Sequence, residues 1–285
     1  MSLTQPPHGV EWPIEGFIHF FEQMPTWQRL VWVAVCLTAG WIAENGRPLF
    51  RFDYRKWSHA RVNLVFFVML AVVGAAFAAG MVGLFKWIER REIGLLHRID
   101  WPLWVELLVA VIALDLIAQY LAHFLLHKLG WMWKFHMVHH SDLKVDATTG
   151  TRLHPGDYVF RELFAVATIV VVGIPIAAYF FYRFLTIFFA YATHANIDMP
   201  RWLDRTLALV FVTPNMHKFH HHFELPWTDT NFGNIFSVWD RIFGTFVYDD
   251  LKRIRYGLNA LDGRLDENLL YQLKLPFDRR IGPGK

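Results

Sequence analysis

Long apolar segments constrain the fold of this chain more than any other feature of its sequence. Residues 62–85 contain no charged side chain, residues 103–126 contain only Glu106 and Asp115, and residues 27–43 are nearly as apolar. A helix needs about 17–25 mostly apolar residues to cross a bilayer. We therefore predict membrane-spanning helices at residues 27–43, 62–85 and 103–126. Because charged groups inside a membrane are costly, Glu106 and Asp115 are expected to face a functional interior.

A fourth apolar stretch, residues 159–193, is longer than one span needs and is interrupted by Gly173-Ile174-Pro175. His127 follows the third predicted span, and His194 follows this stretch. If both histidines belong to one site, an even number of membrane crossings must separate them. We therefore predict two short helices, at 159–174 and 176–193, that form a hairpin entering the bilayer and returning to the same side.

The composition supports one membrane domain, because hydrophobic residues make up 54% of the chain, against roughly 45–50% in soluble domains. Residues 1–26 are expected to be a polar or interfacial segment without a secretory signal peptide. Residues 27–260 would form the membrane domain, and residues 261–285 a C-terminal tail. The predicted fold class is an all-α integral membrane helical bundle, with about three spans plus the hairpin and a cytosolic helical cap carrying histidine clusters.

The charge pattern favours contact with lipid over nucleic acid. The net charge is only +3, and the basic residues lie between apolar segments, as expected of loops facing anionic lipid. By the positive-inside rule, the basic loop between the first two spans is cytosolic, so the exit of the third span is cytosolic too. The loop contains Arg47, Arg51, Arg55, Lys56 and Arg61. The opposite side has four basic residues accompanied by three acidic ones, which weakens the asymmetry without reversing it.

Eleven of the fifteen histidines fall into three clusters and two single sites, at the ends of the apolar segments. The first cluster has HxxxH spacing, and the other two have HxxHH spacing. Residues three and four apart share a helix face, so each cluster can aim its imidazoles at one point. One metal ion binds only a few imidazoles, so the eight histidines in these motifs predict two metal ions in one cage. They are His123, His127, His136, His139, His140, His217, His220 and His221.

Three alternative roles for these histidines fit the clusters less well. Interfacial histidines satisfied by water or lipid headgroups would not need this repeated spacing. A bis-histidine haem protein would have isolated axial histidines on spanning helices. A membrane zinc protease would show an HExxH motif, which is absent from the clusters. The nitrogen donors suit two iron ions that must also bind oxygen.

The order HxxxH, HxxHH, HxxHH, followed by WDRIFGT at 239–245, resembles the fatty acid hydroxylase/sterol desaturase superfamily. The likeness extends over roughly residues 60–260 and includes the asparagine–aromatic–glycine element at 231–233; Asp115, Tyr120 and Ser141 also match. The resemblance implies a membrane-bound di-iron oxidoreductase that uses O2 to hydroxylate or desaturate a lipid C–H bond. It also implies that the eight motif histidines are the ligands of two Fe ions.

The same resemblance implies roles for residues outside the motifs. His194 matches a family histidine at the end of the last apolar helix and is expected to be a ninth ligand. Asp198 replaces a second family histidine four residues later, so whether it binds metal or contacts a ligand stays open. Asp115 and Asp240 are candidates to accept hydrogen bonds from ligand imidazoles. For Asp240 the alternative is a surface ion pair with Arg241.

Further residues are expected around the metals. His154 would line the entrance or contact a ligand, and Asn231 would lie near the ligands as part of the family element. His222 falls off the face shared by His217 and His221, so it would contact solvent or substrate. The remaining histidines are expected to be ordinary loop or interface residues; they are His8, His19, His59 and His97.

The implied reaction needs two electrons from an external donor. The chain has no GxGxxG dinucleotide fingerprint, and its single cysteine, Cys36, excludes an iron–sulfur cluster within one chain. A cytochrome b5- or ferredoxin-type protein is therefore the expected partner, beside the membrane and a lipid substrate. The alternative function is a non-catalytic membrane metal-binding or metal-carrier protein. A carrier would need a polar pathway through the spans, for which the spans supply few groups.

Overall fold

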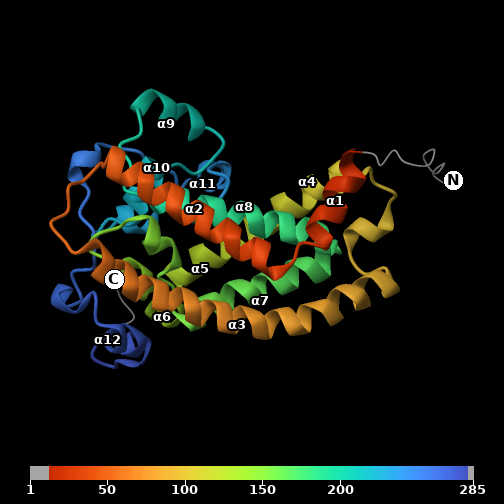
Figure 1. Ribbon diagram of the computed structural model, residues 1–285, viewed down its shortest axis with the longest axis horizontal. Helices are drawn as coiled ribbons and strands as arrows, with labels where there is room; N and C mark the ends of the chain where they lie inside the picture. The colour runs from red at the N-terminus through yellow and green to blue at the C-terminus, as the bar shows by residue number, and fades with distance from the viewer. Residues whose placement is uncertain (1–12, 282–285) are drawn as a thin grey trace.

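The computed structural model describes residues 13–281 as an elongated helical bundle (Figure 1). Residues 1–12, including His8, lie outside the described range. Within residues 13–281 there are no β-strands, only two isolated bridges, so the predicted all-α class is confirmed. The helices are α1 Pro13–Glu22, α2 Thr26–Gly46, α3 Lys56–Arg91, α4 Leu103–Leu114, α5 Ala122–Lys128, α6 Gly130–His140, α7 Pro155–Val172, α8 Ile176–His194, α9 Arg201–Leu207, α10 Pro214–His220, α11 Val238–Ile242 and α12 Leu269–Lys274.

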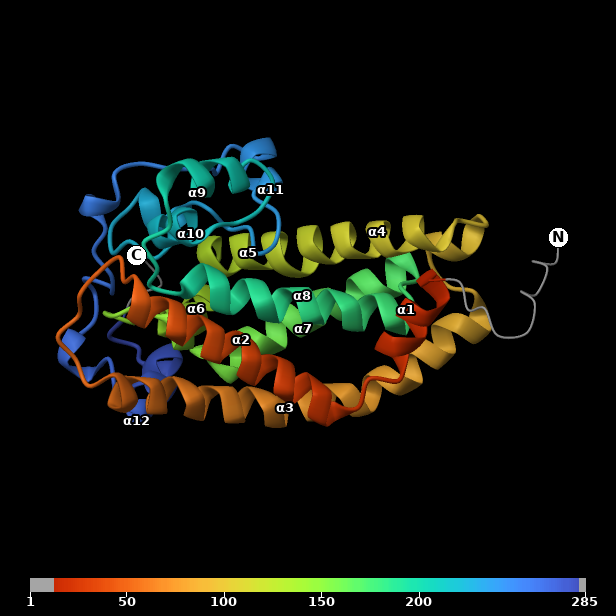
Figure 2. The ribbon, with the colours of Figure 1, turned by 45° about the horizontal axis from the view of Figure 1, so that its top comes forward.

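Three helical segments are long and apolar enough to cross a membrane: Lys56–Arg98, Leu103–Lys128 and Ile176–His194. Three spans were predicted and three candidates are found. The predicted spans 62–85 and 103–126 lie within the first two candidates, but the third candidate is α8 and not residues 27–43. Helix α2, predicted as the first span, is not among them, because Gln28, Arg29 and other polar residues make it less apolar. It lies along α8, itself a candidate span (Figure 2), and its Trp32 indole nitrogen donates to the Phe184 carbonyl at 3.0 Å.

The predicted hairpin is present as α7 and α8. Gly173 ends α7 in the left-handed conformation, with φ 76°, and Pro175 precedes α8. A side chain at Gly150, just before α7, would come within 2.7 Å of the Ala190 carbonyl in the last turns of α8. Both ends of the hairpin therefore lie at the same end of the bundle. The two helices are not short as predicted, because 18 and 19 residues give lengths of about 27–28 Å.

The ends of the spanning helices, α6, and the segments after α8 gather at one end of the molecule (Figure 1). The C-terminal segment packs there too: Leu275 joins a buried cluster with Phe66 of α3 and Trp133 of α6. Gln272 accepts a hydrogen bond from the Ser141 hydroxyl at 2.9 Å. Residues 261–281 thus pack directly against the helix that bears the second histidine motif.

Candidate metal centre

The structure gathers nine histidines into two adjacent buried groups. The first group comprises His123, His127, His136, His140 and His220, and the second comprises His139, His194, His217 and His221. Within each group, one ring nitrogen from each residue lies within 4.8 Å of all the others. The eight histidines of the three motifs and the single His194 therefore lie together, although they come from four helices and the residue that follows α10.

The HxxHH spacing explains how each of the two HxxHH motifs contributes histidines to both groups. On a helix, residues i and i+4 share a face, whereas i+3 points well away from i+4. On α6, His136 and His140 accordingly face the first group, while His139 faces the second. At α10 the assignment is reversed, with His217 and His221 in the second group and His220 in the first; the HxxxH pair of α5 lies wholly in the first.

The distances between ring nitrogens are those of ligands around an ion. The Nε2 atom of His194 lies 3.0 Å from that of His139 and 3.1 Å from those of His217 and His221. In the first group, the Nε2 atom of His136 lies 3.0 Å from that of His123 and 3.2 Å from that of His140. Two nitrogens each bound to one ion at about 2.1 Å, at a right angle, are about 3 Å apart.

The outer ring nitrogens fix the tautomer of several ligands. The Nδ1 atom of His123 lies 2.9 Å from the Phe232 carbonyl oxygen, and that of His220 lies 2.7 Å from the Thr230 carbonyl. In the second group, the Nδ1 atoms of His139 and His194 face carbonyls at 3.2 and 2.6 Å. A carbonyl only accepts, so each Nδ1 is the protonated nitrogen and each Nε2 directs a lone pair inward. Convergent lone pairs without protons repel one another, so this donor set fits bound cations.

Two carboxylates hold further imidazoles of the first group. Asp157 Oδ2 lies 2.5 Å from His136 Nδ1, and Asp229 Oδ1 lies 3.2 Å from His127 Nδ1. Asp157 is itself held by the Arg161 guanidinium at 2.8 Å. A carboxylate on the outer nitrogen orients the imidazole and increases its basicity as a metal ligand.

The protein environment keeps the imidazoles neutral. Burial lowers the pKa of His139, His140, His217 and His221 well below the usual value, and neighbouring imidazoles lower it further. Neutral histidine is the form that binds metal. The site is therefore arranged as a ligand set at neutral pH.

The structure places Asp115 and Asp240 away from the imidazoles, which corrects the expectation that they accept from ligands. Asp115 is buried and accepts from the Trp239 indole nitrogen at 2.9 Å and from two backbone amides at 3.1 and 3.2 Å. Asp240 accepts from the amide nitrogens of Phe232 and Gly233 at 2.7 and 2.9 Å, and it forms no surface ion pair with Arg241 because it is fully buried. Both carboxylates shape the loop whose Phe232 carbonyl holds His123.

Four more residues named in the sequence analysis form contacts outside the histidine groups. Asp198 pairs with Arg47 at 3.2 Å on the surface. The Nδ1 atom of His154 caps α7 by accepting from Gly156, and His222 accepts from the Glu224 amide and donates to the Arg253 carbonyl, so it is buried and not solvent-facing. Asn231 contacts no imidazole: its amide group donates to the Met216 and Val247 carbonyls at 2.9 and 2.8 Å. It thereby ties α10 to the chain after α11.

Several supporting residues were not predicted from the sequence. Asp157 and Asp229 were not selected, since their partners lie 21 and 102 positions away. The only local signal was that each follows a turn-forming proline by two or three residues. His59, expected to be an ordinary loop or interface residue, is fully buried on α3, 3.3 Å from Asp142. Lys218 is also buried and donates to the Ala195 carbonyl at 2.8 Å, joining α10 to the end of α8.

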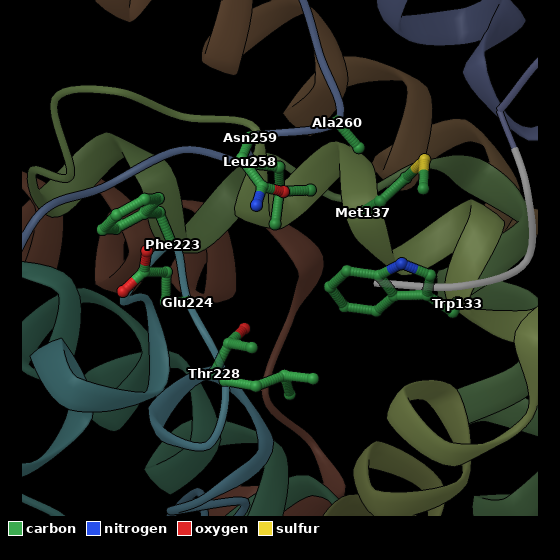
Figure 3. A pocket seen from close by; sticks show the side chains of 9 residues that line it. Trp133, Met137, Phe223, Glu224, Thr228, Leu258, Asn259 and Ala260 are labelled. Atoms are coloured by element: carbon green, nitrogen blue, oxygen red, sulfur yellow. The ribbon is translucent and has the colours of Figure 1, made fainter.

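A cavity of about 190 Å³ lies beside the first group (Figure 3). Trp133 and Met137 of α6 form one wall, and side chains from the loops at 223–228 and 258–260 surround the rest. The Trp133 ring centroid lies 4.9 Å from that of His127 and 5.3 Å from that of His140. The indole therefore lines the cavity and also contacts two imidazoles of the first group.

Comparison with known proteins relates the chain to a family. The fatty acid hydroxylase family model matches residues 107–245, a range that includes all nine histidines. The matched range is just under half of the chain, and members of this family are histidine-box di-iron lipid hydroxylases and monooxygenases. The resemblance recognised in the histidine motifs is therefore confirmed.

Three relatives illustrate the range of the family. Ornithine lipid hydroxylase OlsE of Rhizobium tropici is 29% identical over 183 residues, covering 64% of this chain and 53% of that protein. Alkylglycerol monooxygenase of Caenorhabditis elegans is 30% identical over 163 residues, covering 55% and 30%. Cholesterol 25-hydroxylase-like protein 1, member 2, of Danio rerio is 27% identical over 125 residues, covering 43% and 44%. The chain thus spans about half the length of the first relative and less of the others. No solved structure matches it significantly.

Proposed function

We propose that this protein is a membrane-bound di-iron oxygenase that hydroxylates a C–H bond of a lipid. The observation that supports this most directly is the convergence of nine imidazoles into two adjacent groups. The overall reaction would convert C–H, O2, two electrons and two protons into C–OH and water. Hydroxylation is favoured over desaturation because the three relatives above bear the names of hydroxylases or monooxygenases.

The nine histidines would hold the two iron ions, the first group one and the second group the other. Imidazole nitrogen suits iron, and bound iron would supply the activation of O2. The protein's own contribution is to fix and shield the ligands. Asp157 and the backbone carbonyls hold the outer nitrogens, as described above. The buried Phe232 ring packs against His123, His127 and His220, with ring centroids 5.7, 5.1 and 5.8 Å away, and keeps water from the first group.

The substrate would be an amphiphilic lipid reaching the centre from the bilayer. The relatives are named for an ornithine lipid, alkylglycerol and cholesterol, which share an apolar body with a small polar group. The electrons would come from a separate cytochrome b5- or ferredoxin-type protein, since residues 13–281 show no second redox site beyond the histidine groups. We also propose residues 27–260 as the catalytic unit and 261–285 as a tail, of which the described part, up to residue 281, braces α6.

The metal-bearing end would face the cytosol. The basic loop between α2 and α3 lies at this end, where the Leu49 amide donates to the Asn196 carbonyl at 3.1 Å, two residues after His194. In a Cys36→Ser background, cysteines at exposed position 51 and half-exposed position 198 should react with a membrane-impermeant reagent from the cytosolic side. A cysteine at exposed position 98, at the other end, should react from the opposite side. Labelling of 51 and 98 from the same side would refute this orientation.

The function is tested by expressing the protein in cells and comparing their lipids with those of cells expressing His136→Ala. Growth under ¹⁸O2 should yield a lipid that gains one labelled oxygen atom only with the unaltered protein. A lipid that loses two hydrogens without gaining oxygen would indicate desaturation instead. Two bound iron ions without any change in lipids, in cells supplied with donor proteins, would favour the metal-carrier alternative.

A further inference from the structure

A group of exposed apolar side chains lies at the end of the cap formed by α9, the loop that follows it, and α11. We call this group the apolar tip; it consists of Leu207, Leu209, Val210, Phe211, Ile242 and Phe243. Leu209 and Ile242 are 59% and 62% exposed. Soluble surfaces rarely gather so many large apolar side chains, and such patches mark contacts with a partner or a membrane.

The tip is a rigid surface. The Ser237 hydroxyl donates to the Ala208 carbonyl at 2.7 Å, and the Ser237 amide donates to the Val210 carbonyl at 3.0 Å, which ties the loop to the start of α11. The ring of Phe211 stacks on Phe236, with centroids 5.9 Å apart. Its exposed side chains are therefore held outward by a fixed backbone.

The charges around the tip are arranged to meet an anionic surface. The carboxylates of α9 and α11, Asp204 and Asp240, are fully buried and bonded inside the cap. The arginines of the same two helices are exposed: Arg201 pairs with Asp250 at 3.3 Å, whereas the guanidinium groups of Arg205 and Arg241 lie over the rings of Tyr248 and Phe246. Basic residues near an anionic leaflet each contribute about 1 kcal/mol to membrane binding. The exposed face thus combines apolar side chains with positive charge.

The tip also continues the lipid-facing surface of the spans. Figure 2 shows α9 and α11 beside α5, on the outer side of the bundle, where α4 continues toward the other end. Phe211 stacks on Phe189 of the candidate span α8 at 5.8 Å, next to the exposed Phe188. Phe243 stacks on Tyr120, at 5.2 Å, next to the exposed Leu121. Two stacked aromatic pairs therefore join the tip to helical segments that carry exposed apolar side chains.

We infer that the apolar tip is a lipid-binding surface, inserted into the boundary between headgroups and acyl chains of the leaflet at the metal-bearing end. Interfacial elements bury their apolar side chains about 5–10 Å into this boundary. The contact would hold the cap on the membrane through the two stacked pairs. Tyr120 precedes His123 by three residues, and Phe189 precedes His194 by five, so both anchors lie within about a turn of proposed ligands.

Spin-label accessibility in nanodiscs that hold one full-length chain each tests this inference. Leu209→Cys and Ile242→Cys would be labelled separately in a Cys36→Ser background, in discs containing anionic lipid. Val68→Cys, on the exposed face of α3, is the lipid-facing control, and Arg264→Cys is the water-facing control in the cap. Labels at 209 and 242 should resemble the label at 68, with high accessibility to O2 and low accessibility to a polar nickel complex.

Two outcomes would overturn the inference. Labels at 209 and 242 that behave like the label at 264 would show that the tip faces water. Labels that are open to both reagents in single-chain discs, but become shielded from both when several chains share a disc, would show that the tip is a contact between copies of this chain. The proposed reaction could stand or fall independently of either result, because no catalytic activity is measured.

Discussion

Replacing Asp157 by Asn should weaken metal binding more than any other substitution outside the histidines. Asp157 is fully buried and accepts two hydrogen bonds, from His136 Nδ1 at 2.5 Å and from Arg161 Nε at 2.8 Å. An amide of the same shape has one oxygen and one NH2 group. Whichever way it is turned, one of the two contacts brings two donors together.

The size of the effect follows from this geometry. Removing an outer partner of a metal-bound histidine lowers metal affinity about 10–100-fold, which is about 1.4–2.7 kcal/mol. We expect the upper end of that range, because the contact is short and excluded from solvent. Asp229→Asn is the matched control: its contact with His127 is 3.2 Å and its side chain is 19% exposed. That variant should lose about tenfold or less.

The assay is the metal retained per chain after purified protein in detergent is equilibrated with chelator buffers of known free Fe²⁺ concentration. Thermal unfolding of each variant controls for general loss of structure. Iron binding by Asp157→Asn within twofold of the unaltered protein would refute the role given to this carboxylate. A larger loss of affinity in Asp229→Asn than in Asp157→Asn would refute it as well.

Three further predictions use other parts of the site. His220→Ala should lower both iron content and lipid hydroxylation. His97 is exposed at the opposite end of the bundle, so His97→Ala should change neither. Equal losses in the two variants would argue against the site. Asn231→Ala should destabilise the protein by about 2–4 kcal/mol in thermal unfolding. The substitution leaves buried backbone groups unpaired and puts alanine at φ 55°. An unchanged melting temperature would contradict this expectation. In metal-free protein, burial lowers the pKa of four histidines outside the spans, so the unfolded chain binds more protons below pH 6.5. Stability should therefore fall as pH drops through that value, by up to about 1.4 kcal/mol per pH unit for each histidine, and a melting temperature that rises toward pH 5.5 would refute the assignment.

The helices and the histidine groups could be predicted because their signals are local. The length of an apolar segment identifies a membrane-spanning helix, and the i, i+3, i+4 spacing of histidines places them on one face of a helix. His194 has no such motif; the family resemblance suggested it as a ligand, and the assumption that it shares a site with His127 led to the predicted hairpin. Helix α2 has an apolar middle within 21 residues, yet its composition leaves it outside the candidate spans. Its packing along α8 could not be seen in the sequence.

The residues that support the ligands could not be predicted, because they depend on packing between distant segments. Asp115 and Asp240 fit the idea of carboxylates that bind imidazole, yet nearby backbone amides and an indole nitrogen bind them instead. Asp157 has that role because α7 packs beside α6, which no local spacing encodes. Most of the other acceptors are backbone carbonyls, such as those of Phe232 and Thr230, and every residue type has one.

The central claim is that the nine histidines form two separate sites for one iron ion each. Metal analysis by mass spectrometry of the full-length protein should find two iron ions per chain. The double variant His194→Ala, His217→Ala removes two of the four ligands of the second group and none of the first, so it should retain one ion per chain. Two ions retained in that folded variant, or fewer than two in the unaltered protein after iron loading, would contradict the claim.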